Sequence, residues 1–216
     1  MHIPEGPLSV SAVGIGILGA GAALTAAGTA WGLRKMDYER VPQVALLSSA
    51  FFAASLIHVP LGGTSVHLVL SGLVGLVLGW AAFPAILIAI ALQAAFFGFG
   101  GITTLGVNTL VMALPAVVSY ALFHPLVHSN REIVAAVAGC AAGMMAILMG
   151  AFLLAGILTA AGHQFHRLAQ TVLLAHLPVA VIEGMVTSSA VLFLRKVRPE
   201  LLDAPCVPAE VRTLDA

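Results

Sequence analysis

Residues 65–92, SVHLVLSGLVGLVLGWAAFPAILIAIAL, contain no Lys, Arg, Asp or Glu. A helix needs about 20 mostly apolar residues to cross the hydrocarbon core of a bilayer, and this stretch exceeds that length. Of the 216 residues in the chain, 60% are hydrophobic and 8% are charged, whereas a soluble domain carries about 25% charged residues. Too little polar surface remains to cover a water-exposed globule. The sequence therefore predicts an all-α integral membrane protein.

Apolar stretches separated by Gly, Pro and charged residues predict about seven transmembrane helices in one domain over residues 1–198. Gly79, Trp80 and Pro84 are all that divides the third helix from the fourth, and the sixth is long enough to lie tilted in the bilayer. The predicted helices lie near residues 9–33, 42–59, 66–80, 83–98, 105–124, 132–160 and 170–194.

The positions of Lys and Arg predict the orientation of the chain. Of nine such residues, eight follow the first, fifth or seventh helix and so share one side of the membrane, while Arg167 lies on the other. Because cytoplasmic loops are enriched in Lys and Arg, we expect the N-terminus outside and the C-terminus in the cytoplasm. Residues 1–8 then form an extracytoplasmic loop, and residues 199–216 a polar cytoplasmic tail without a fold of its own. The net charge of zero gives no basic surface for nucleic acid.

The histidines gather on the predicted outer side, which holds six of the eight. On the inner side, His124 and His128 are four residues apart, a spacing that can place two metal ligands on one helical face. They also flank Pro125 beside a charged loop, where an interfacial pair is the simpler interpretation. The outer histidines are His2, His58, His67, His163, His166 and His176, of which His163 and His166 fall in a solvated loop that needs no site.

His176 and Glu183 are seven residues apart in the last predicted helix. Two helical turns place them on one stripe, about 10 Å apart along the axis. Because an ionisable residue inside a span is expensive, the pair suggests a functional site. The alternative is a buried polar contact that holds helices together, with Asn108 as a partner.

The first two residues can form a metal chelate. No Lys or Arg precedes Arg34, so a signal peptide is not indicated, and we expect a free amine on Met1. That amine and the backbone nitrogen of His2 close a five-membered ring around an ion, and the same nitrogen and His2 Nδ1 close a six-membered ring. Square-planar nitrogen ligation suits Ni²⁺ and Cu²⁺. An outer imidazole, His58 or His67, would supply the fourth nitrogen, although many chains begin Met-His by chance.

Four ordered motifs resemble the CbiM/NikM family, the substrate-binding membrane components of energy-coupling factor (ECF) importers for cobalt and nickel. They are MHIPEG (1–6), GGTSVHLVLSGLVGLVLGW (62–80), FGFGGITTLGVNTLVMALPA (97–116) and AHLPVAVIEG (175–184). The resemblance covers nearly the whole chain except the tail after about Arg198.

The resemblance implies a specific site. The family's metal ligands correspond to the Met1 amine, the His2 amide nitrogen and imidazole, and the His67 imidazole, while His58 is a bystander. Four further residues match motif positions that would hold the N-terminal loop or orient the imidazoles. These are Thr103, Asn108, His176 and Glu183.

The resemblance also implies partners in the cell membrane of a prokaryote. They are a transmembrane coupling (T) protein, two cytoplasmic ATPases and a small accessory membrane subunit. The chain has no GxxxxGK[ST] loop, so we expect a transporter subunit rather than an enzyme, with no cofactor and with Co²⁺ or Ni²⁺ as substrate. The Irving–Williams order and the planar chelate favour nickel, but the family serves both metals. Small residues in the first helix, 14–28, suit close packing either inside the bundle or against the coupling protein.

Other functions make different demands. An ion- or proton-coupled transporter would use His176 and Glu183 as a relay and would work without ATPase partners. An intramembrane metalloenzyme would need a motif such as HExxH, which the sequence lacks. A structural scaffold explains the apolar helices but not the gathering of histidines on one side.

Overall fold

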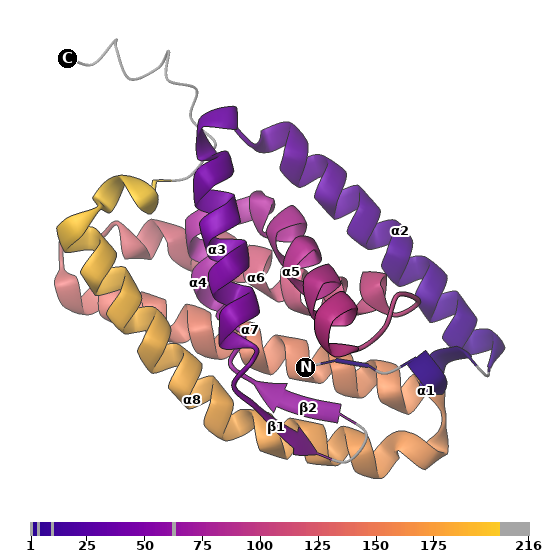
Figure 1. The fold of residues 1–216 in the computed structure, drawn as a ribbon. Helices are drawn as coiled ribbons and strands as arrows, with labels where there is room; N and C mark the ends of the chain where they lie inside the picture. The colour runs from indigo at the N-terminus through magenta and orange to yellow at the C-terminus, as the bar shows by residue number, and fades with distance from the viewer. Residues whose placement is uncertain (1, 4, 10, 62–63, 204–216) are drawn as a thin grey trace.

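A computed structural model describes residues 2–3, 5–9, 11–61 and 64–203. Helices form nearly all of it, and two short strands lie at one end of the bundle (Figure 1). The α-helices are α1 (Glu5–Ser9), α2 (Ala12–Lys35), α3 (Val41–Ala54), α4 (Ser71–Leu78), α5 (Ala82–Phe97), α6 (Leu105–Val127), α7 (Glu132–Ala161) and α8 (His166–Val197). The strands are β1 (His58–Leu61) and β2 (Thr64–His67), and the 3₁₀ helices are η1 (Tyr38–Arg40), η2 (Gly79–Ala81), η3 (His163–Phe165) and η4 (Pro199–Leu201).

Five helical segments in the described part of the chain are long and apolar enough to cross a membrane. They confirm the prediction of a multi-pass membrane protein. α3 has 14 residues, fewer than the roughly 20 that a hydrocarbon core requires. The passage of seven helices through the bilayer therefore stays a prediction. The five segments are Ala12–Lys35, Ser71–Phe97, Leu105–Val127, Glu132–Ala161 and His163–Val197.

The segment Ser71–Phe97 turns back on itself at η2. A straight helix of this length would hold its ends about 40 Å apart. Instead, His67 before α4 and Phe99 after α5 both stack on the ring of His2, with centroids 5.0 and 5.8 Å away. Gly79 supplies the turn with a left-handed φ of 55°. The chain thus reverses at the boundary that the sequence predicted between the third and fourth helices.

The predicted helices 42–59 and 66–80 are wrong where they meet the β-hairpin. α3 ends at Ala54 and α4 begins at Ser71, so the fold is not all-α over this segment. Between them β1 and β2 pair antiparallel, with His58 opposite His67. Val and Thr favour extended backbone, Pro60 disfavours a helical residue before it, and the two residues between the strands match a hairpin connection. A strand, and not a helix start, therefore carries His67.

α2 packs its glycines against the rest of the bundle. A Cβ added at Gly21 would overlap the side chain of Val107, and one added at Gly32 would overlap the carbonyl oxygen of Trp80. At Gly16, by contrast, nothing lies within 4 Å. The sequence left open whether the small residues of this helix pack inside the bundle or against a coupling protein. The buried small face of α2 packs on α5 and α6 within the bundle. This face consists of Gly14, Gly21, Thr25, Gly28 and Gly32.

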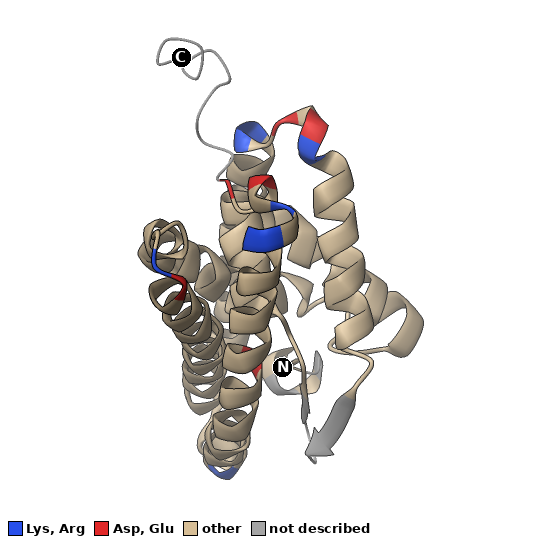
Figure 2. Cartoon of the chain, turned by 90° about the vertical axis from the view of Figure 1, so that its left-hand side faces the viewer, with Lys and Arg blue, Asp and Glu red and all other residues tan. Residues whose placement is uncertain are grey.

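Lys and Arg gather toward one end of the bundle, with one blue position at the opposite end (Figure 2). Arg195 joins two helices at the charged end, since its guanidinium donates to the carbonyls of Val127 at 2.9 Å and Ser129 at 2.7 Å. Which end faces the cytoplasm stays a prediction.

The first residues of the predicted tail lie against this end of the bundle. Leu202 is 2% exposed. The carbonyl oxygens of residues 201, 202 and 203 accept hydrogen bonds from Gln43, His124 and Arg40, at 3.1, 2.9 and 2.8 Å. Residues 204–216 lie outside the described residues.

Candidate metal site

Two imidazoles, those of His2 and His67, meet inside the bundle. Their Nε2 atoms are 3.2 Å apart, the rings stack at an angle of 24°, and the residues are 4% and 3% exposed. The carbonyl of Leu68 accepts a hydrogen bond from His67 Nδ1 at 2.9 Å, which leaves His67 Nε2 as the unprotonated nitrogen. Nitrogens about 2.1 Å from one ion and at right angles lie about 3 Å apart. The spacing of the two Nε2 atoms therefore suits a shared ion.

The atoms that face each other differ from those of the predicted chelate. That chelate uses Nδ1 of His2, whereas it is Nε2 that faces His67. The His2 ring must therefore turn before Nδ1 can share an ion with His67. The predicted amine ligand belongs to Met1, which lies outside the described residues. Within the residues that the structure describes, no cluster of three or more His, Cys, Asp or Glu side chains could hold a metal.

The protonation of His2 follows from its surroundings. Burial lowers the pKa of the His2 imidazole well below its usual value, and the neighbouring His67 lowers it further. The ring is consequently neutral near pH 7, which is the form that binds a metal.

Asn108 on α6 holds the N-terminal segment by two hydrogen bonds. Its Oδ1 accepts the backbone N–H of Ile3 at 2.8 Å, and its Nδ2 donates to the Ile3 carbonyl at 3.2 Å. Nδ2 also lies 3.2 Å from Oγ1 of Thr104. Because Asn108, Ile3 and Thr104 are all buried, these bonds dock the segment inside the bundle and bring the adjacent His2 to His67.

A glycine-rich loop also contacts His2. Phe99 in this loop stacks on the His2 ring, with centroids 5.8 Å apart and an angle of 28°, so His2 has two stacking neighbours, Phe99 and His67. Gly100, with a φ of 81°, lies so close that an added Cβ would be 2.6 Å from Asn108 Nδ2. A side chain at Gly100 would thus displace the residue that holds the N-terminal segment.

Glu183 on α8 holds the chain just after His67. Its carboxylate accepts the backbone N–H groups of Val69 and Leu70, the latter at 2.8 and 3.0 Å from its two oxygens. Leu70 has a left-handed φ of 57° and precedes the first residue of α4. The carboxylate thereby supplies acceptors to a helix start that has no side-chain cap of its own.

His176 and Thr103 are placed differently from Asn108 and Glu183. His176 is wholly buried and donates from Nδ1 to the carbonyl of Val172 at 2.7 Å, and its Nε2 has no hydrogen-bond partner among the described residues. Thr103 is exposed, and it is the buried Thr104 that contacts Asn108. Of the four predicted supporting residues, Asn108 and Glu183 therefore contact the segments that carry the imidazoles.

The remaining histidines form other contacts. The rings of His124 and His128 are tilted by 46° with centroids 4.5 Å apart at the charged end, where His128 lies 3.5 Å from Asp203. His163 and His166 are edge to face at the start of α8. His58 begins β1, and its side chain lies outside what the structure describes.

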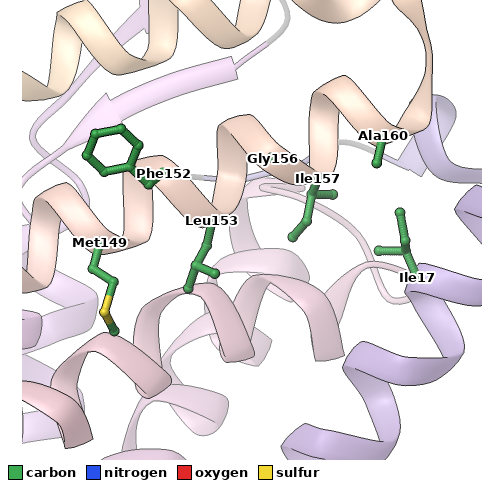
Figure 3. A pocket seen from close by; sticks show the side chains of 7 residues that line it. All are labelled: Ile17, Met149, Phe152, Leu153, Gly156, Ile157 and Ala160. Carbon is green, nitrogen blue, oxygen red and sulfur yellow. The ribbon is translucent and has the colours of Figure 1, made fainter.

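An apolar cavity of 460 Å³ lies between α2 and α7 (Figure 3). Its lining carries no nitrogen or oxygen ligand apart from backbone, so it differs in chemistry from the imidazole pair. The lining residues are Ile17, Met149, Phe152, Leu153, Gly156, Ile157 and Ala160.

Three residues near the imidazoles were not predicted from the sequence: Gln93, Phe99 and Thr104. Gln93 had a usable signal, since it is the lone polar side chain of α5, AFPAILIAIALQAAFF, and polar groups in apolar spans are often functional. Phe99 and Thr104 had none beyond their place in a glycine-rich motif.

The fold defines a multi-pass membrane protein, and its buried imidazole pair offers the nitrogen ligands that transition metals take. The chain belongs to the CbiM family, described as the cobalt uptake substrate-specific transmembrane region, which matches residues 2–201.

Relatives named as metal transport proteins agree with this family. A putative metal transport protein of Haemophilus influenzae is 41% identical over 206 residues, covering 94% of this chain and 97% of that protein. The fused nickel transport protein NikMN of Rhodobacter capsulatus is 32% identical, covering 97% of this chain and 66% of that protein. A crystal structure of a transition metal transporter is similar with a TM-score of 0.73 and 28% identity, covering 91% of this chain and 93% of that one.

Proposed function

We propose that the protein is the substrate-capture component of an ATP-driven ECF importer that takes up Co²⁺ or Ni²⁺ across the cell membrane of a prokaryote. Membership of the cobalt uptake family supports the substrate class. The observation that carries the proposal is the meeting of His2 and His67, whose Nε2 atoms lie 3.2 Å apart in a buried site.

The proposed ligands are the Met1 amine, the His2 amide nitrogen and imidazole, and the His67 imidazole. Planar nitrogen ligation of this kind suits Ni²⁺ and is also open to Co²⁺. The two hydrogen bonds between Asn108 and Ile3 support the proposal, because they hold the backbone next to His2 at a fixed place. Glu183 would do the same for the segment after His67.

The proposed direction of transport is from the end that carries the imidazole pair toward the end rich in Lys and Arg. The positive-inside rule supports an outer N-terminus and a cytoplasmic C-terminus, and Figure 2 shows the asymmetry of charge. The ion would bind as the N-terminal segment docks and leave when that segment withdraws.

The proposed partners supply the energy. They are a T protein, two cytoplasmic ATPases and a small accessory membrane subunit. The chain has no nucleotide-binding GxxxxGK[ST] motif of its own. The match covers 66% of the relative named as a fused nickel transport protein NikMN, and the remaining third supports an accessory segment encoded with the capture component.

The position of the amine provides the main test. Protein tagged at the C-terminus should copurify with cobalt or nickel, and a long extension ahead of Met1 should abolish binding because the amine leaves the chelate. His67→Ala should weaken binding. A single added residue moves the histidine to the third position, where one amine, two amides and one imidazole complete a square, so metal should be trapped and not transported. Unchanged metal content in the long extension would refute the proposal.

The alternative of a proton-coupled transporter is less well supported. Both oxygens of Glu183 accept backbone N–H groups, and the hydrogen bond of His176 is to the Val172 carbonyl. Uptake of ⁶³Ni or ⁵⁷Co by cells that lack the ATPase genes distinguishes the two functions, since only a proton-coupled carrier would continue to transport.

A further inference from the structure

The segment after α8 lies against the charged end of the bundle. Residues 199–203, here named the strap, comprise η4 and the two residues after it. Three consecutive carbonyl oxygens of the strap, those of residues 201–203, accept hydrogen bonds from side chains of other elements. Leu202 of the strap is buried, with 2% of its surface exposed. The strap is thus fixed through its backbone and through a buried side chain.

The strap ties α3 to the rest of the bundle. Gln43 of α3 donates to the Leu201 carbonyl at 3.1 Å. Arg40, which precedes α3, donates to the Asp203 carbonyl at 2.8 Å. From α6, His124 donates to the carbonyl between these two at 2.9 Å. Loss of the bonds from Gln43 and Arg40 would therefore release the charged end of α3 from the strap.

An unfilled space lies beside α3. A cavity of 420 Å³ has a mostly apolar lining from α3, α4 and α8, and Gln43 and Leu201 also line it. α3 itself packs on α5 and α4, and the residues that it buries are Val44, Ser48 and Phe51. A helix that packs through one narrow stripe next to a cavity has room to shift, because close-packed neighbours do not block it. The strap therefore restrains a helix whose own packing leaves it room to move.

The opposite end of α3 leads stiffly into the hairpin that carries His67. After α3 ends, the N–H groups of Ser55, Leu56 and Ile57 all donate to carbonyls of α3, and β1 begins at the next residue. β1 pairs with β2, whose last residue is His67. A shift of α3 is therefore carried to the hairpin. After His67 the chain is held by Glu183, so this imidazole lies between a helix that can shift and a fixed contact.

We propose that the strap is a latch on the ion site. While its bonds to Arg40 and Gln43 hold, α3 and the hairpin keep His67 beside His2. When these bonds break, α3 shifts toward the cavity, the hairpin follows, and the His67 imidazole leaves the ion. The inference rests on the proposed function, because it assigns the opening of the same site to the charged end of the bundle. It adds no ligand to that site.

The test measures how fast nickel leaves the purified full-length protein. Nickel-loaded protein is mixed with excess chelator, and the loss of bound nickel is followed over time. Gln43→Leu and Arg40→Met each remove one bond to the strap, whereas Arg40→Lys keeps a donor. Ser49→Ala is the matched control, because it removes a bond from a side chain of α3 to the carbonyl of Ala45 on the same helix.

The latch predicts faster release without loss of capacity. Gln43→Leu and Arg40→Met should each release nickel about 2–10-fold faster than the native protein, the factor that one hydrogen bond supplies, and the double variant faster still. Arg40→Lys and Ser49→Ala should release nickel at the native rate. All variants should hold the native amount of nickel at saturation, since every proposed ligand is retained. In the first two variants, backbone hydrogen exchange should quicken in α3 and the hairpin and stay unchanged in α7.

The outcomes separate the two proposals. Native protein that binds no nickel, or His67→Ala that binds like native protein, refutes the proposed function. If native protein binds nickel and His67→Ala binds it more weakly, equal release rates for Gln43→Leu and Ser49→Ala refute the latch. Exchange that quickens equally in α7 also refutes the latch, because that pattern marks a general loss of stability. If Gln43→Leu fails to fold, Arg40→Met takes its place in the comparison.

Discussion

The carboxylate of Glu183 accepts the backbone N–H of Leu70 with both of its oxygens, at 2.8 and 3.0 Å. The two residues are 113 positions apart, and the contact joins α8 to the start of α4. His67 lies three residues before Leu70, at the end of β2. One buried side chain thus holds both the start of α4 and the segment just after His67.

Replacing Glu183 should cost both stability and metal affinity. In Glu183→Ala the N–H groups of Val69 and Leu70 lose their acceptor, at about 1–3 kcal/mol each. Glu183→Gln keeps one oxygen and should lose about half as much. Thermal unfolding in detergent, followed by tryptophan fluorescence, measures the stability. A Glu183→Ala protein that melts with the native chain would show that the carboxylate does not support the turn.

Replacing Asn108 should loosen the N-terminal segment. Asn108→Leu removes both hydrogen bonds to Ile3, so the Ile3 amide should exchange with solvent faster and bound nickel should dissociate about 10–100-fold faster. Thr109→Val is the control on the next position of α6, because Thr109 is buried and its hydroxyl has no hydrogen-bond partner among the described residues. Equal dissociation rates for the two variants would contradict a holding role for Asn108.

Adding one methyl group should have opposite effects at two glycines. A Cβ at Gly75 on α4 would overlap the carbonyl oxygen of Ala116, so Gly75→Ala must separate α4 from α6 and should destabilise the fold by on the order of 3 kcal/mol. At Gly16 the space is open, and Gly16→Ala should stabilise the helix by about 0.5–1 kcal/mol. Unfolding midpoints of the two variants, compared in one detergent, test both signs.

The histidines at the charged end should be dispensable for binding. The double variant His124→Ala, His128→Ala should keep native cobalt and nickel content, because both residues contact the segment around Leu202 and Asp203 instead of the imidazole pair. It should also make the bonds beyond Pro199 more accessible to protease. Loss of bound metal in this variant would contradict the prediction, because it would show that a metal ligand lies at the charged end of the bundle.

Hydropathy predicts most of this fold because long apolar helices have one dominant requirement, the burial of backbone polar groups in lipid. It fails at the β-hairpin, where short apolar strands and helices have the same hydropathy. The signal present in the sequence was the pair Gly62 and Gly63 between two short segments that each contain a Val, HVPL and TSVH, which is typical of a hairpin.

Some residues of the candidate site were predicted and others were missed, for a reason that differs from that for the hairpin. Motif similarity singled out Asn108 and Glu183, but it could not predict that both bind backbone groups, because those partners lie more than 100 residues away. Gln93 went unpredicted because its complete burial depends on how α5 packs in the folded chain. Long-range partners of this kind depend on packing and leave no periodic pattern.

The contact between Glu183 and Leu70 has a consequence for biogenesis. Translation delivers His2 and His67 to the membrane long before α8, so for most of synthesis the chain carries both imidazoles without the carboxylate that fixes the segment after His67. In the proposed site, the contact that holds the segment after His67 is complete only when the last helix has been inserted. We therefore expect metal retention to report on finished insertion, and a chain that stalls before residue 183 should not sequester metal.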